Sequence, residues 1–332
     1  MLALKTEGLT KDYRSGFWQR RVRVLHDLNL EVQQGDIFGY LGPNGAGKTT
    51  TLKLLMGLIH PTAGRAWILG RDISDVAVKA QLGFLPETPS FYDYLTGREF
   101  LHFYGQLFGL PYGERRRRVD ELLDVVGLSK AGELQLRKYS KGMLQRIGLA
   151  QALINDPQAV FLDEPMSGLD PVGRKEVRDL ILDLKARGKT VFFSTHIISD
   201  VEMICDRVGI IVAGRLIRVG PLEELLGSEV ESIEITASGL DEAAWVEIAR
   251  WSVRPPVQRG DKVFFAVPTE KDASQALGLL LNRGAVIHTV HPHRLTLEEH
   301  FLREVASREE SRGVSPEQGR GASPEQGRGG GS

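Results

Sequence analysis

Residues 42–49 read GPNGAGKT and match G-x-x-x-x-G-K-[ST], the pattern of a phosphate-binding loop. The apolar run Ile37–Leu41 before the loop predicts a buried strand, and residues 50–56 after it predict the first turns of a helix. Glycines let the backbone curl until several N–H groups point at one phosphate, and the helix adds its positive dipole end. This strand–loop–helix unit predicts an α/β fold of the P-loop NTPase type.

Two side chains of the loop have separate predicted roles. Lys48 brings a positive charge to the β- and γ-phosphates of a nucleotide, and the Thr49 hydroxyl is a ligand for Mg²⁺. The predicted nucleotide contacts of this segment are Gly42, Pro43, Asn44, Gly45, Ala46, Gly47, Lys48, Thr49 and Thr50.

Further predicted strands end in residues that suit phosphoryl transfer. The apolar residues 159–162 are followed by Asp163 and Glu164, and His196 follows a strand predicted at 190–195. Open α/β sheets bind ligands at the carboxyl ends of their strands. Asp163 therefore suits the magnesium shell, and Glu164 suits the polarisation of the attacking water. A single histidine in this place is usually structural, but convergence on one edge favours a γ-phosphate contact for His196.

A second candidate anion site lies at the start of a helix that runs through residues 145–153. Ser140 is a suitable N-cap for this helix. The N-terminus of a helix attracts anions, yet the P-loop already serves the phosphates. One interpretation is that Ser140 contacts the γ-phosphate of a nucleotide held by a second copy of the domain.

Charge and composition narrow the class of protein. The chain of 332 residues has 42 Lys and Arg against 43 Asp and Glu, a net charge of −1, which implies no bulk attraction to nucleic acid. Cys205 is the one cysteine, which excludes an internal disulfide and fits a reducing cytosol. No apolar run approaches the roughly 18 residues that span a bilayer. We expect a cytoplasmic location, with any membrane role carried by a partner.

The N-terminal residues 1–35 predict an antiparallel layer with strands at 2–6, 23–25 and 28–32. Tyr13 follows the first of these. Alone, it is best interpreted as a packing residue at a strand end, but the nucleotide site downstream favours stacking on an adenine. Residues 17–23 are basic and aromatic, and we interpret them as a solvated hairpin; contact with a partner or with lipid headgroups is the alternative.

Apolar residues recur at helical spacing across 97–127 and predict a helical insertion, which we place at about 95–150. The basic run Arg115–Arg118 within it is interpreted as a solvated helix face.

The pattern changes after residue 221, where we place the end of an ATPase domain. Residues 222–306 predict a small α+β accessory domain. Its predicted strands lie at 232–236, 263–267 and 286–290, and its predicted helices at 241–251, 272–283 and 297–305.

The C-terminal part contains a group of histidines and a repeated octapeptide. Metal binding by His288, His291, His293 and His300 is not favoured, because no cysteine and few acids accompany them. Residues 307–332 contain the octapeptides SPEQGRGA and SPEQGRGG and predict a disordered tail.

These motifs, in this order, resemble the nucleotide-binding subunit of ATP-binding cassette (ABC) transporters over roughly residues 2–220. The resemblance identifies residues 42–49 as Walker A, Asp163 and Glu164 as the Walker B acids, 167–170 as the D-loop and His196 as the switch histidine. It places Tyr13 at the adenine. It implies a core sheet that is mainly parallel, an antiparallel layer, ATP and Mg²⁺ as ligands, and hydrolysis with Glu164 and His196 as catalytic residues.

Two positions depart from the family pattern. The signature L-S-G-G-Q is here YSKGM, which keeps Ser140 and Gly142 as ATP contacts but has Lys141 for the first glycine. Lys141 either adds charge near the γ-phosphate or faces solvent. Glu87 replaces the Q-loop glutamine and remains an oxygen ligand for magnesium or water, beside Thr49 and Asp163. Both departures are similar to ATPases that pair with ABC-2 type permeases, such as drug exporters.

The resemblance therefore implies a homodimer with two ATP molecules at its interface, which drives an ABC-2 permease from the cytoplasmic face of the inner membrane. The permease is expected to dock beside Glu87 and residues 91–104. The alternative is a soluble ABC ATPase that acts on ribosomes or DNA. It is weakened by the single P-loop, by the absence of a heptad run and by the neutral charge. A P-loop kinase gives no reason for the helix start at 139–143.

Overall fold

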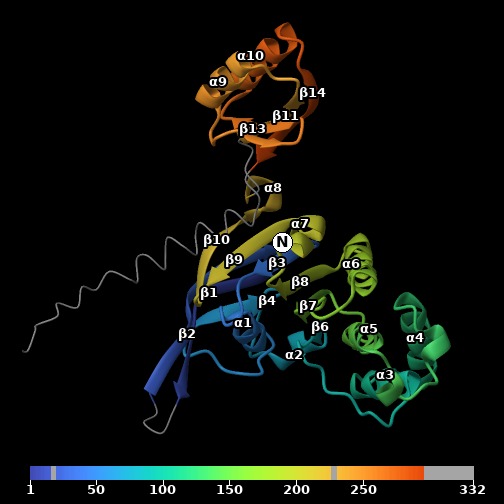
Figure 1. Ribbon diagram of the computed structural model, residues 1–332. Coiled ribbons are helices and arrows are strands. Elements are labelled where there is room, and N and C mark those ends of the chain that lie inside the picture. Colours follow the sequence, from blue (N-terminus) through green and yellow to red (C-terminus); the bar gives the residue numbers. More distant parts are fainter. Residues whose placement is uncertain (16–19, 226–229, 295–332) are drawn as a thin grey trace, which may run out of the picture.

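The predicted strand–loop–helix unit lies at the centre of a six-stranded sheet (Figure 1). The computed structural model describes residues 1–15, 20–225 and 230–294. The strand order is β10-β9-β3-β8-β7-β6, in which only the β9–β10 pair is antiparallel. These strands are β3 Ile37–Leu41, β6 Leu82–Leu85, β7 Ala159–Asp163, β8 Thr190–Thr195, β9 Arg207–Val212 and β10 Arg215–Pro221. The mainly parallel core sheet is confirmed.

Strands β3, β7 and β8 are buried along their whole length, which explains their continuous apolar sequences. Because all three run in parallel, the residues that follow them meet at one edge. This brings the P-loop, the acids at 163–164 and His196 together.

The expected antiparallel layer is present, with four strands in the order β2-β1-β4-β5, and it packs on helix α1. Its strands are β1 Leu2–Ser15, β2 Arg20–Gln33, β4 Ala63–Ile68 and β5 Arg71–Asp72, and α1 spans Lys48–Leu55. The first two strands are longer than predicted, since they continue past the core as an exposed ribbon whose polar residues give no burial signal. The solvated hairpin predicted at 17–23 is confirmed for 20–23, which are exposed and belong to strand β2 rather than to a loop. Residues 16–19 lie outside the described residues.

The helical insertion is confirmed, with α3 Gly97–Leu107, α4 Tyr112–Val125 and α5 Lys141–Ala152. Thr96 and Glu99 form a reciprocal capping box at the start of α3. The basic run is only partly solvated. Arg118 donates to the Leu153 carbonyl at 2.8 Å and its side chain is 19% exposed, so it ties α4 to the end of α5.

Shorter helices and one long helix complete this part of the chain. They are α2 Val76–Lys79, α6 Pro171–Ala186, α7 Ile198–Ile204 and α8 Leu222–Leu225, with 3-10 turns at Ser129–Ala131 and Leu136–Lys138. Helix α6 begins with Asp170 as N-cap, whose side chain accepts from the Gly173 N–H, and with Pro171 in the first turn.

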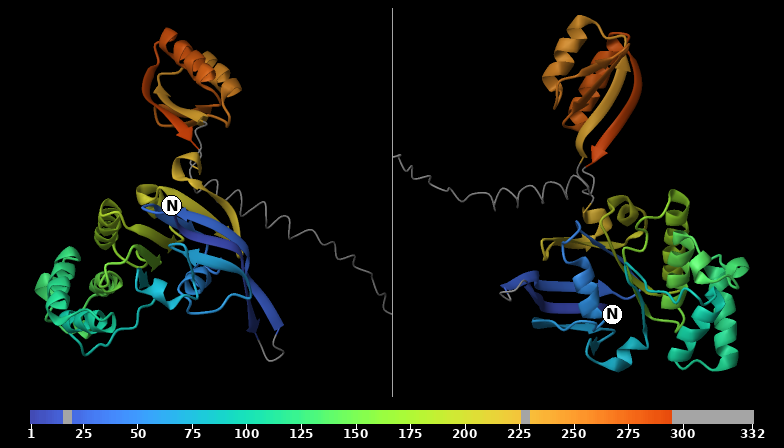
Figure 2. Two further views of the ribbon diagram at one scale, coloured as in Figure 1. Left: turned by 180° about the vertical axis from the view of Figure 1, so that it is seen from behind. Right: turned by 60° about the horizontal axis from the view of Figure 1, so that its bottom comes forward.

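The C-terminal part forms a separate sheet in the order β12-β13-β11-β14, in a β–α–β–β–α–β succession (Figures 1 and 2). Its elements are β11 Val230–Ser238, α9 Glu242–Trp251, β12 Val257–Arg259, β13 Lys262–Val267, α10 Glu270–Asn282 and β14 Val286–Arg294. Strand β12 was not predicted, since its side chains are all exposed. The strands and helices have their own apolar cluster, which includes Ile235, Phe265 and Leu280. The predicted helix 297–305, His300 and the tail 307–332 lie outside the described residues.

No helix in the described part of the chain is long and apolar enough to cross a membrane.

Candidate functional site

The backbone of the P-loop has the conformation that phosphate binding requires. Gly45 and Gly47 have φ values of 79° and 104°, which disfavour any side chain. A Cβ at Gly42 would lie 2.3 Å from the carbonyl oxygen of Ile211, so the loop packs directly on β9. A Cβ at Gly45 would meet nothing within 4 Å, which leaves its backbone open to a ligand. The loop thus fits the phosphates that its sequence predicts.

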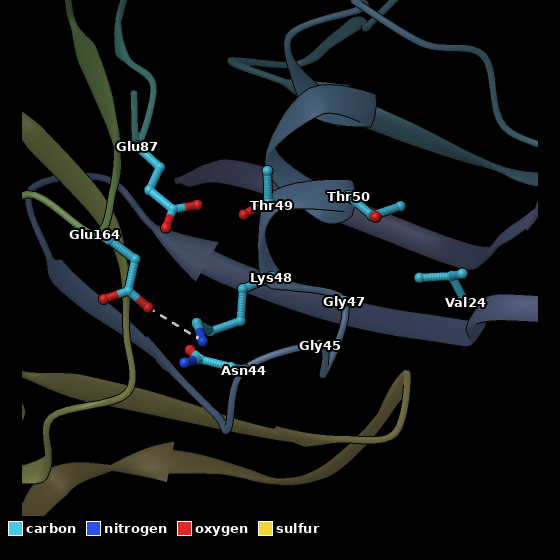
Figure 3. Close-up of a pocket in the computed structure, with 9 residues that line it drawn as sticks. All are labelled: Val24, Asn44, Gly45, Gly47, Lys48, Thr49, Thr50, Glu87 and Glu164. Carbon is cyan, nitrogen blue, oxygen red and sulfur yellow. Dashed lines mark ion pairs between the residues drawn. The ribbon is translucent and has the colours of Figure 1, made fainter. Parts of the chain in front are cut away.

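A cavity of about 240 Å³ opens above this loop (Figure 3). It is lined by Val24, Asn44, Gly45, Gly47, Lys48, Thr49, Thr50, Glu87 and Glu164. Apart from Val24, all of these were predicted. Val24 was missed because an apolar residue in a strand gives no sign of facing a ligand.

Lys48 is the cation at the centre of the site. Its Nζ donates to the carbonyl oxygens of Gly42 at 2.7 Å and Pro43 at 3.2 Å, and lies 3.1 Å from Oε1 of Glu164. The side chains of Lys48 and Glu164 are 5% and 6% exposed. At this burial a charge needs a partner, so the two side chains hold each other at the point where the strand ends meet.

Glu164 is held from several directions. Its Oε2 lies 2.9 Å from Nδ1 of His196, a half-exposed ring. Its backbone N–H donates to the hydroxyl of Ser194 at 3.1 Å. Glu164 also has a φ of 50°, a left-handed conformation that is costly for a residue with a side chain. Such strain persists only where the surroundings enforce it, which supports a functional role for this carboxylate.

Asp163 is the most deeply buried acid of the site, at 1% exposure. Burial raises the pKa of its carboxyl, and the charges of Glu87 and Glu164 raise that pKa further; hydrogen bonds from Ser194 and Thr49 oppose the shift. The Ser194 hydroxyl donates to Oδ1 of Asp163 at 2.6 Å. Ser194 thus links both acids, a role that sequence reasoning missed. The register that pairs Asp163 with Ser194 across β7 and β8 is the signal that would have revealed it.

Ser194→Ala should weaken the site without rearranging it. We expect a loss of about 1–2 kcal/mol in the free energy of unfolding, since a buried hydrogen bond is lost, and a roughly tenfold higher Mg²⁺ requirement of the ATPase. Thermal unfolding and a Mg²⁺ titration of the rate test this. Ser199→Ala, an exposed change on α7, is the control; equal behaviour of the two variants would contradict the assignment.

Asp163→Asn should stabilise the protein at neutral pH in the absence of Mg²⁺ while abolishing hydrolysis. Because the folded-state pKa of Asp163 is raised, the ionised form costs stability above that pKa, and the cost disappears when the pH falls below the ordinary value near 3.8. The variant's melting temperature should therefore exceed that of the wild type at pH 7, with the two converging in acid. A lower melting temperature at pH 7 would contradict the assignment.

The predicted magnesium ligands are Thr49, Asp163 and Glu87. Thr49 hydrogen-bonds the Asp163 carboxyl, while Glu87 is an exposed residue on the opposite wall of the cavity (Figure 3). Among the described residues, no three His, Cys, Asp or Glu side chains converge into a metal site. The Thr49 hydroxyl and the carboxylates of Asp163 and Glu87 nevertheless fit Mg²⁺, because this ion keeps several waters and binds through one or two carboxylates together with phosphate oxygens. Of the histidines of β14, the described His288 and His291 form no such group either.

Ser140 and Gly142 do not line this cavity. Ser140 caps α5 and accepts from the Met143 N–H at 3.3 Å, and both residues lie at the exposed start of that helix. Lys141 is exposed at the start of α5, which agrees with the second of its two predicted positions. Its Nζ lies against the backbone of Gly168, where an added Cβ would be 1.9 Å away. This lysine therefore connects the start of α5 to the segment after Glu164 in the same chain.

Tyr13 is also outside the cavity. It lies on the exposed ribbon of β1, opposite Val22, with Nζ of Lys11 5.3 Å from its ring centre. Its role at the adenine stays a prediction, as do the other roles of individual site residues.

Comparison with known proteins assigns the family. The family model described as ABC transporter matches residues 25–167. The ABC transporter ATP-binding protein sll0415 of Synechocystis is 46% identical over 308 residues, which cover 92% of this chain and 85% of that protein. The chain belongs to the ATP-binding proteins of ABC transporters.

Two further matches extend this result. The bacitracin transport ATP-binding protein BcrA of Bacillus licheniformis is 41% identical to this ABC protein over 243 residues, covering 72% of this chain and 76% of BcrA. The ATP-binding cassette MJ0796, solved as a dimer in a post-hydrolysis state with ADP and Pi, matches with a TM-score of 0.61 and 26% identity, covering 66% of this chain and 98% of that one. The ABC ATPase fold is thereby confirmed, and ATP hydrolysis is the general activity of this family.

Proposed function

We propose that this ABC protein hydrolyses ATP at the interface of two copies and thereby drives an ABC-2 type membrane permease, as an exporter. The proposal is supported by the separation, within one chain, of the two groups of predicted ATP contacts. The P-loop and Glu164 line one cavity, and Asp163 and His196 lie beside Glu164, whereas the start of α5 is exposed and outside that cavity. A second copy that presents Ser140 and Gly142 over the P-loop completes the site.

The residues of this chain have complementary roles in such a site. Lys48 and the loop amides bind the β- and γ-phosphates. Thr49 and Asp163 would hold Mg²⁺, which would neutralise phosphate charge. Glu164 orients the water that attacks the γ-phosphate. His196 and Ser194 fix the position of Glu164, and Lys48 pairs with its carboxylate in a buried setting.

The permease contact is proposed at an apolar groove beside Glu87. A cavity of about 370 Å³ lies between β6, α3 and α5, lined by residues that include Pro89, Phe91, Phe100 and Tyr104. Next to it, Tyr92 and Tyr94 are 44% and 66% exposed. Exposed aromatic side chains around an apolar groove favour binding of a helix through its apolar face. Docking here places the ATPase on the cytoplasmic face of the inner membrane.

The direction of transport rests on likeness. The relative BcrA is named for bacitracin transport, and the departures at Lys141 and Glu87 are similar to those of drug-exporter ATPases. Export is therefore the direction we propose.

Co-expression of this chain with a membrane subunit that is encoded by a neighbouring reading frame tests the proposal. Phe91→Ala combined with Tyr94→Ala should lower co-purification at least tenfold, whereas Leu182→Ala, an exposed change on α6, should not. ATP-dependent loading of antibiotic peptides into inverted vesicles would support export. Recovery of this chain on ribosomes or DNA, with no membrane subunit, would instead favour the soluble alternative.

A further inference from the structure

The C-terminal sheet has one covered and one open face. Helices α9 and α10 pack on the face that carries Val263, Phe265 and Val267, all of which are buried (Figure 2). Nothing in the described part of the chain covers the other face. There, Phe264 and Val257 are 41% and 50% exposed and lie directly opposite each other across β12 and β13.

A cavity of about 550 Å³ lies on this open face. Its lining combines an apolar centre with three charged residues, Glu234, Arg254 and Arg259. Within the ranges that the structure describes, none of the three forms an ion pair. Charges of both signs around an apolar patch are typical of a protein interface.

The strand register places two of these charges symmetrically about Phe264. Glu234, on β11, lies opposite Ala266, two residues beyond Phe264 on β13. Arg259, on β12, lies opposite Lys262, two residues before Phe264. Phe264 is thus midway between an acid on one side and a base on the other.

We propose that this open face binds the same face of a second copy, in a contact that does not require nucleotide. A two-fold axis that lies in the interface and passes over Phe264 brings Arg259 of each copy over Glu234 of the other. The contact then consists of two ion pairs around a pair of Phe264 rings. Such a surface is self-complementary, as an isologous dimer requires. It would keep two ATPase copies together after ATP hydrolysis has separated their nucleotide sites.

Cross-linking of nucleotide-free, full-length protein tests this contact separately from any ATP-dependent dimer. The face is small, so its dimer is expected to be weak, and cross-linking also captures transient pairs. Thr236 is a suitable position because it lies beside Phe264 on the open face. The wild type is a clean background, since Cys205 is buried and its burial raises the pKa of the thiol. With a short bis-maleimide, Thr236→Cys should cross-link about tenfold more than Ser274→Cys, an exposed position on α10.

Charge reversal supplies the decisive control. In the Thr236→Cys background, Glu234→Arg and Arg259→Glu should each lower cross-linking about tenfold, because like charges then face each other, and the double variant should restore it. Failure of the double variant to restore cross-linking would overturn the proposal. A second outcome would also overturn the proposal: the Thr236→Cys thiol does not cross-link and is also protected from a monofunctional maleimide. Another part of the chain would then cover the open face.

Discussion

Glu164→Gln should abolish steady-state ATP hydrolysis while ATP binding persists. The amide keeps the shape of the carboxylate, but it cannot act as the base toward water, so we expect the rate to fall by about 10²- to 10⁴-fold. Because the ATP at the interface is no longer consumed, the protein should accumulate as an ATP-dependent dimer. Phosphate release and light scattering with and without ATP measure the two effects.

Two controls keep this test specific. Glu202→Gln, a change on α7 outside the cavity, should leave the rate unchanged. His196→Ala should lower the rate less than Glu164→Gln does, since His196 acts through its 2.9 Å contact with Glu164. A Glu164→Gln protein that stays monomeric with ATP and retains wild-type hydrolysis would show that this carboxylate is not the base.

Lys48→Ala should lose ATP binding and also destabilise the fold. Removal of charge-assisted hydrogen bonds to phosphate lowers affinity by about 100-fold or more. The substitution also leaves Glu164 as a buried charge without its cation, a change that typically costs about 3–5 kcal/mol. Calorimetry and thermal unfolding separate the two effects.

A double variant distinguishes the structural role of Lys48 from its binding role. Addition of Glu164→Gln to Lys48→Ala removes the uncompensated charge, so the melting temperature should recover in part. ATP affinity should stay low, because the amide does not replace the lysine. Recovery of both properties together would mean that Lys48 acts on ATP only through folding.

The positions of the P-loop, the two acids and His196 were predictable because each follows a strand with a continuous apolar sequence. A strand that is buried on both faces has a continuous apolar sequence, which can be recognised without a structure. Parallel strands then bring their carboxyl ends to one edge of the sheet. The apolar faces of the helical insertion and of α10 were predictable for the same reason. The exposed strand β12 and the outer ends of β1 and β2 carry no such signal.

The connections within the site could not be predicted. Ser194 links Asp163 and Glu164 only through the register of β7 on β8, and a serine in an apolar run is unremarkable in sequence. The contact of Lys141 with Gly168 depends on how α5 packs beside the segment after Glu164, which joins residues far apart in the chain. Side-chain orientation, rather than residue type, decides both.

The same reasoning explains Tyr13 and Val24. An aromatic before a nucleotide motif predicts stacking on adenine, and this stays a prediction for Tyr13, which does not line the cavity. Val24, on the neighbouring strand, does line it. Twist and register of an exposed ribbon decide which of its side chains reaches the site.

The central claim is that the nucleotide site is completed by a second copy of the chain. It is tested most directly by a structure of Glu164→Gln protein with ATP and Mg²⁺ bound. We predict that Ser140 Oγ and the backbone N–H of Gly142 from one copy lie within hydrogen-bond distance of the γ-phosphate held by Lys48 of the other. An ATP-loaded structure in which the start of α5 contacts no nucleotide of a neighbouring copy would contradict the account.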